Sequence, residues 1–114
     1  MKTTTRVEFN IKIEPLRAVV VVHVDSSLDL GGSMARCCGM PRDNNRPYLV
    51  EIYSRSAAMS VIAHEAVHAA AFILEYKGIS SQHDGMELTA YIVQYICEKA
   101  ENKLWINRKD LQGA

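Results

Sequence analysis

The chain has 114 residues, enough for one small domain with a single hydrophobic core and too few for a separate specificity domain. We therefore expect residues 1–114 to form one domain. The 13 basic and 13 acidic residues balance to zero net charge and are well mixed, so neither nucleic acid nor an anionic membrane is an expected partner.

Residues 6–13 alternate polar and apolar side chains with a period of two, which predicts a strand that buries one face. Pro15 ends this strand. Residues 16–24 are rich in valine, which indicates a strand covered on both faces at the centre of a small sheet. His23 lies within it, and we interpret this isolated histidine as structural rather than as a ligand.

Residues 25–47 are rich in Gly, Ser, Asn, Arg and Pro, so we expect an irregular segment that could line a site. Residues 48–53 form the third predicted strand. Because this strand directly precedes a helix, its exposed edge is a candidate for pairing with an extended substrate backbone. Ser54 or Ser56 would cap the helix that follows.

The first helix is predicted at about residues 56–77 and ends at Gly78. Its apolar side is formed by Met59, Ile62, Ala66 and Ile73. His64 and His68 lie on the other side, and alanines fill much of the rest. We therefore expect this helix to pack on both sides and to carry buried histidines.

A second helix is predicted at about residues 86–103, and Trp105 and Ile106 are expected to anchor the tail that follows. Its core face is formed by Leu88, Ile92, Val93, Ile96 and Ala100. Its other side carries a stripe formed by Glu87, Tyr91, Gln94 and Glu98. Such a stripe is typical of solvated surface. The predicted fold class is α+β, with a three-stranded sheet packed on two helices.

The longest apolar run, residues 18–22, is too short to span a bilayer, and no signal-peptide core follows Met1. Cys37, Cys38 and Cys97 form an odd set without CxxC spacing, which argues against a disulfide framework and against a cysteine zinc site. We expect a cytoplasmic protein whose cysteines are ordinary small residues.

The first helix carries an HExxH motif formed by His64, Glu65 and His68. At four residues' separation the two imidazoles lie on the same helical face, close enough to hold one metal ion, with the glutamate beside them. Neutral imidazole suits Zn²⁺, and a carboxylate next to a zinc-activated water can accept its proton. The motif therefore predicts metal-dependent hydrolysis, with Glu65 as general base. A site that binds metal without cutting is the stronger alternative.

A catalytic zinc ion usually has three protein ligands, and the sequence offers His83, Asp84 and Glu87 downstream. Glu87 is favoured because it opens the second helix, 19 positions after His68, which leaves room for antiparallel packing of the two helices. The helix dipole alone also explains an acidic residue at this position. The three candidates, and a site without a third protein ligand, therefore stay open.

The HEAVH helix, followed by ELTAY at residues 87–91 on a second helix, resembles the gluzincin zinc metallopeptidases, especially the very small ones with a short sheet and two helices. It is also similar to small HExxH proteins of bacteriophages and prophages. The resemblance covers about residues 48–98, roughly half of the chain. It implies that Glu65 is the general base. It assigns zinc binding to His64, His68 and Glu87.

Two departures from this resemblance are visible. Larger gluzincins carry subdomains that close the substrate cleft, and this chain has no room for one. The segment His83-Asp84-Gly85 also resembles the His-Gly element that supplies a third histidine in SprT-like proteases, but here an aspartate separates the two residues.

The expected function is a zinc-dependent metallopeptidase that acts on a peptide or protein substrate. Tyr91, one turn after Glu87, is a candidate catalytic residue that would donate a hydrogen bond to the oxyanion, and a packed surface aromatic is equally compatible with the sequence. Gln94 is a weaker candidate for supporting a zinc ligand. The alternatives are a non-catalytic zinc-binding interaction protein on a metalloprotease scaffold and a hydrolase of non-peptide amides.

Overall fold

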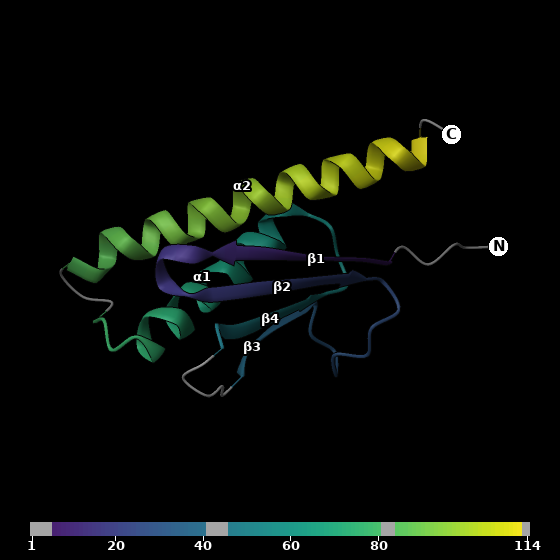
Figure 1. Cartoon of the computed structure of the whole chain (residues 1–114). Helices are drawn as coiled ribbons and strands as arrows, with labels where there is room; N and C mark the ends of the chain where they lie inside the picture. The colour runs from purple at the N-terminus through teal and green to yellow at the C-terminus, as the bar shows by residue number, and fades with distance from the viewer. Residues whose placement is uncertain (1–5, 41–45, 81–83, 113–114) are drawn as a thin grey trace.

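The computed structural model describes residues 6–40, 46–80 and 84–112 of the chain. Four strands form one sheet in the order β1-β2-β4-β3 (Figure 1). The strands are β1 (Arg6–Ile13), β2 (Ala18–Asp25), β3 (Ala35–Met40) and β4 (Tyr48–Ser54). β2 and β4 are parallel neighbours, whereas β1 pairs with β2, and β3 with β4, in antiparallel fashion. β1 and β3 are therefore the edges of the sheet.

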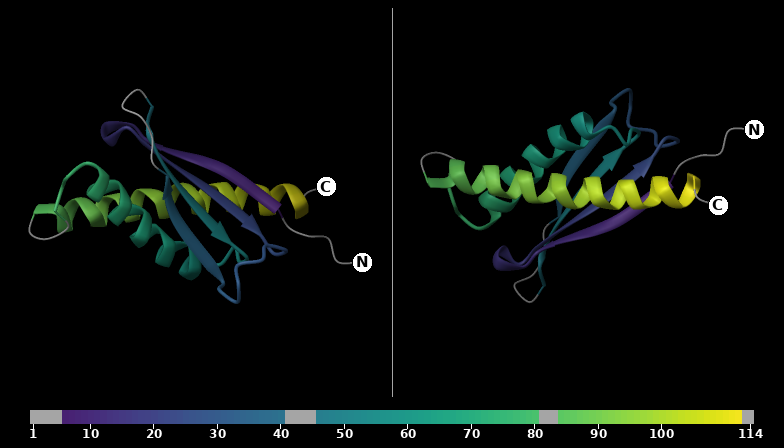
Figure 2. Two further views of the ribbon diagram at one scale, coloured as in Figure 1. Left: turned by 90° about the horizontal axis from the view of Figure 1, so that it is seen from below. Right: turned by 90° about the horizontal axis from the view of Figure 1, so that it is seen from above.

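Two helices, α1 (Met59–Tyr76) and α2 (Asp84–Gln112), cover one face of this sheet (Figures 1 and 2). The burial pattern of β2 agrees, because every second residue is buried and those between are only half-buried. The central position predicted for this valine-rich strand is confirmed. The prediction that both of its faces are covered was wrong.

One hydrophobic cluster joins the sheet to both helices. Its fully buried members include Val20, Val22, Val50, Ile52, Ile62, Ile73 and Ile96. The predicted α+β class, a small sheet packed on two helices, is thus confirmed, although the sheet has four strands and not three. No helix in the described part of the chain is long and apolar enough to cross a membrane.

The additional strand, β3, lies in the segment that was expected to be irregular. Ala35, Cys37 and Gly39 pair with the buried positions of β4 and therefore face the helices. All three residues are small. A Cβ atom at Gly39 would collide with the Tyr48 hydroxyl and lie 3.1 Å from a carbon of the Phe72 ring. Glycine therefore allows these two aromatic side chains to pack beneath the edge strand.

The predicted end of α1 is confirmed, because Gly78 follows it with a positive φ of 72°. Its beginning differs from the prediction. The N-cap residue is Ala58, which has no capping side chain, while Ser56 accepts a hydrogen bond from the Ala58 N–H just ahead of the helix. At the other end of the chain, Trp105 and Ile106 are 60% and 45% exposed, so the prediction that they anchor the tail was wrong.

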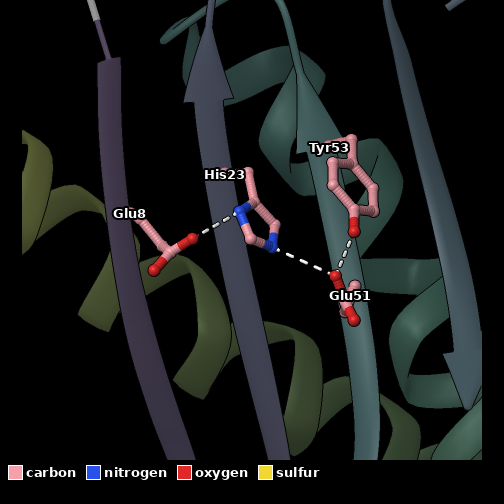
Figure 3. A network of polar contacts seen from close by, with 4 residues as sticks. All are labelled: Glu8, His23, Glu51 and Tyr53. Carbon is pink, nitrogen blue, oxygen red and sulfur yellow. Dashed lines mark hydrogen bonds and ion pairs between the residues drawn. The ribbon is translucent and has the colours of Figure 1, made fainter.

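A polar network of Glu8, His23, Glu51 and Tyr53 lies on the sheet face turned away from the helices (Figure 3). His23 Nδ1 is 2.8 Å from Glu8 Oε1, and its Nε2 is 3.1 Å from Glu51 Oε2. Tyr53 donates a hydrogen bond to the same Glu51 oxygen and stacks on the imidazole, with ring centroids 4.5 Å apart. This hydrogen bond, together with burial and nearby negative charge, raises the pKa of Tyr53 to about 12. These contacts support a structural role for His23.

Replacing His23 by alanine is expected to lower the free energy of unfolding by about 1–3 kcal/mol, because the half-buried Glu51 loses its imidazole partner. Glu8→Ala is the matched control. Its side chain is 59% exposed, so its removal is expected to cost less than about 1 kcal/mol. Urea denaturation measures both values. Equal, small effects of the two substitutions would contradict a stabilising network.

Candidate metal centre

The HExxH motif lies along the boundary between the buried and the exposed sides of α1. With 3.6 residues per turn, Glu65 is directed toward the sheet while His64 and His68 are directed outward. Accordingly, Glu65 is only 6% exposed and the His64 side chain is 72% exposed. His68 is also exposed. The helix therefore presents two accessible imidazoles beside one buried carboxylate.

The donor atoms of His64, Glu65 and His68 all lie within 4.8 Å of one another. His64 Nε2 is 3.9 Å from Glu65 Oε2, and the two imidazole rings meet edge to face with centroids 5.1 Å apart. Within residues 6–40, 46–80 and 84–112, this is the one group of three such side chains whose donor atoms gather in this way.

The prediction of buried histidines was wrong, and the cause is visible on the outer side of α1. This side carries Val67, which is 50% exposed, and the exposed Ala71. These apolar residues made both sides of the helix resemble packing surfaces in the sequence. A metal ion at the motif would therefore bind at the surface of the molecule.

The group fits a zinc ion in donor chemistry and in spacing. Zinc binds imidazole nitrogen at about 2.0–2.1 Å, so two ligand atoms of one ion lie no more than about 4 Å apart. The donor atoms of this group lie within 4.8 Å of one another, slightly beyond that limit, and a small rotation of the exposed rings of His64 and His68 would bring them within it. The two histidines would hold the ion, with the Glu65 carboxylate next to it.

Strand β3 is the open sheet edge beside this group. Burial raises the pKa of the Cys37 thiol on β3 to about 12, and the nearby charge of Glu65 contributes to this rise. Cys37 therefore lies close to Glu65. β4 pairs with β2 on one side and with β3 on the other. The prediction that residues 48–53 offer an exposed edge was therefore wrong, and the available edge is that of β3.

Among the described side chains, the favoured candidate for the third protein ligand, Glu87, does not belong to this group. Glu87 lies in the first turn of α2 and is exposed. α2 packs on α1 through the hydrophobic core, whereas the side chains of His64, His68 and Glu87 are all exposed. Zinc ligation by Glu87 stays a prediction. His83 and the side chain of Asp84 lie outside the described part of the chain.

The candidate catalytic residue Tyr91 is 61% exposed and lines a hollow of about 830 Å³ between β1 and α2. Gln94 lines the same hollow, and its amide donates a hydrogen bond of 3.1 Å to Glu98. None of the motif residues lines this hollow. A contribution of Tyr91 to catalysis stays a prediction, and the described geometry places the tyrosine on a separate surface from the metal group.

Comparison with known proteins found no match: no family model, no curated protein and no solved structure is similar to this chain. The interpretation of the site therefore depends on its own residues and geometry.

Sequence reasoning missed the edge strand that borders the metal group. Residues 35–40 show no alternation of polar and apolar side chains, because Cys38 and Met40 on the outward side are apolar, and glycine is depleted in strands. Glu65 and Cys37 lie close together only because this strand forms, so their proximity was missed as well.

Proposed function

We propose that this protein is a zinc-dependent metallopeptidase whose centre is the group of His64, Glu65 and His68. The proposal is carried by one observation, the convergence of two exposed imidazoles and one buried carboxylate on a single helix. A bound zinc ion would supply Lewis-acid activation of a water molecule and of a peptide carbonyl group. The histidines would hold the ion and leave room for substrate.

Glu65 is the general base in this proposal. Its carboxylate lies beside the histidine donors, where it would accept a proton from the attacking water and deliver it to the leaving amine. Its burial against the sheet limits the positions that its side chain can take. A fixed carboxylate next to the reacting atoms loses less entropy when the transition state forms.

The β3 edge is the proposed binding surface for the substrate backbone. An extended peptide can add to an exposed strand by main-chain hydrogen bonds, which gives affinity without requiring a particular sequence. Because Cys37 on β3 lies near Glu65, a peptide paired with this strand would pass the metal group. The small domain thus offers a shallow edge in place of a deep cleft.

Glu87 remains the third zinc ligand that we propose, on the strength of the gluzincin resemblance and of its exposed position at the beginning of α2. A cytoplasmic location is also part of the proposal. The free thiols Cys37, Cys38 and Cys97 suit a reducing compartment.

Removal of zinc is expected to abolish peptide cleavage, and its return to restore it. The test uses a broad peptide library analysed by mass spectrometry before chelation, after chelation and after addition of Zn²⁺. A matched sample receiving Mg²⁺, which prefers oxygen ligands in octahedral geometry, is expected to stay inactive. Cleavage that persists in the fully chelated protein would contradict a zinc mechanism.

A non-catalytic zinc-binding interaction protein is the second candidate. It is favoured by the exposure of His64, because an ion at the surface is open to side chains of another protein. Structural zinc sites are usually closed by four protein ligands. Tight zinc binding, together with a complex in which a partner completes the coordination, would favour this candidate over the peptidase.

A further inference from the structure

Three basic side chains converge on one hollow at the end of the sheet. Arg17, Arg46 and Lys77, together with Tyr76, line a space of about 420 Å³, which we term the basic hollow. Within the described ranges, no acidic side chain lines it and none forms an ion pair with the three cations. In a chain with 13 basic and 13 acidic residues, this is a local concentration of positive charge.

The basic hollow is assembled from three separate segments of the chain. Arg17 precedes β2 and has a positive φ of 48°, a conformation that is costly for a residue other than glycine. Its carbonyl accepts a hydrogen bond of 2.8 Å from the Tyr48 N–H, which ties the starts of β2 and β4 together. Lys77 and Tyr76 come from the end of α1. The fold itself thus brings the cations together.

The hollow lies on the same side of α1 as the buried carboxylate of the metal group. Glu65, Phe72 and Tyr76 are seven and four residues apart, a spacing that places them on one stripe of a helix. Glu65 lies near Cys37 of β3, and Phe72 packs beneath Gly39 of the same strand. This stripe therefore follows the edge strand from the metal group toward the hollow.

The last part of this path is formed by two tyrosines. Tyr48 reaches beneath β3 at Gly39 and stacks on Tyr76, with ring centroids 4.1 Å apart. Tyr76 in turn lines the basic hollow. Glu65 and Tyr76 are eleven residues apart, or about 16 Å along the helix at 1.5 Å per residue. An extended peptide covers this distance in roughly five residues at about 3.3 Å each.

We propose that the basic hollow is a subsite that binds an acidic side chain of the peptide substrate, about four to six residues from the bond to be cleaved. This inference rests on the proposed function, because it takes the peptide to lie along β3 past Glu65. Carboxylates form charge-assisted hydrogen bonds with arginine, often through two parallel contacts. Two arginines and a lysine, with no acidic residue among the described lining residues, suit that ligand.

One acidic residue borders the path and limits the size of the effect. Glu75 is exposed on α1. Burial of Tyr48 raises the pKa of its hydroxyl group, and the charge of Glu75 contributes to this rise. It does not line the hollow, so three cations still face one outer carboxylate. The preference for an acidic peptide is expected to be moderate, about tenfold, as for a few partly exposed ion pairs.

Peptide binding to the zinc-loaded Glu65→Gln variant tests the subsite without requiring catalysis. The probes are fluorescein-labelled peptides that differ only in one Glu or Gln, scanned along the sequence. The Glu peptide is expected to bind about tenfold more tightly at its best position. The double variant Arg17→Gln, Arg46→Gln, introduced into the same background, should abolish this ratio. The matched control Lys12→Gln, Lys99→Gln removes the same charge outside the hollow and should keep it.

Equal affinity for the Glu and Gln peptides at every position would overturn the subsite, as would a Glu preference that survives loss of both arginines. Failure of the proposed function has a different signature. In that case the wild-type protein cleaves nothing, while the Glu preference and its dependence on Arg17 and Arg46 can still be measured.

Discussion

Glu65→Gln is expected to lower the rate of peptide cleavage by about 10²- to 10⁴-fold while the protein keeps its fold and its zinc. The amide has nearly the shape of the carboxylate, so the buried position beside the sheet stays filled. An amide oxygen cannot serve as the proton acceptor. The measurement is kcat/KM on a peptide found by library screening, with zinc content determined on the same preparation.

Glu75→Gln is the matched control for this variant. It makes the same chemical change on the same helix, at an exposed position that is not part of the metal group. Its effect on cleavage of a neutral peptide is expected to be less than about twofold, as for ordinary surface substitutions. If Glu65→Gln and Glu75→Gln had equal activity, Glu65 would not be the general base.

Replacing either His64 or His68 by alanine is expected to weaken zinc affinity by more than about 100-fold. Loss of a group that only supports a metal ligand already costs about 10- to 100-fold, and these residues are the ligands themselves. Because both side chains are exposed, removing them leaves no cavity and no unpaired buried group, so the fold should persist. Competition with a chelator of known affinity measures the change, and circular dichroism monitors the fold.

His23→Ala is the control variant, because it removes a histidine that is not part of the metal group. His23 lies on the opposite face of the sheet in contact with Glu8 and Glu51, so the variant is expected to bind zinc with wild-type affinity even where its stability falls. Unchanged zinc binding in the His64→Ala and His68→Ala variants would locate the metal elsewhere.

The strands and helices with strong periodicity were predictable from sequence. Residues 6–13 alternate strictly, and the stop at Gly78 has a physical cause in its positive φ. β3 was not predictable from the same rules, because Ala35, Cys37 and Gly39 supply little apolar surface on its buried side. Its burial depends on aromatic side chains from other segments, which is a tertiary effect.

The local part of the metal group was also predictable, because one helix fixes the relative positions of His64, Glu65 and His68. The exposure of the metal group was not predictable from the sequence. α1 has apolar residues on both sides, so the pattern alone could not show that the side with His64 and His68 is left uncovered. A third ligand from another element, such as Glu87, depends on how the two helices pack, and sequence spacing does not determine that orientation.

A crystal structure of the zinc-loaded protein would show whether α1 carries a catalytic centre. We expect one zinc ion bound by His64 and His68, with Glu65 beside it, Glu87 as the third protein ligand and one coordination position not filled by protein. Zinc bound away from the motif, or enclosed by four protein ligands, would contradict a catalytic centre on α1.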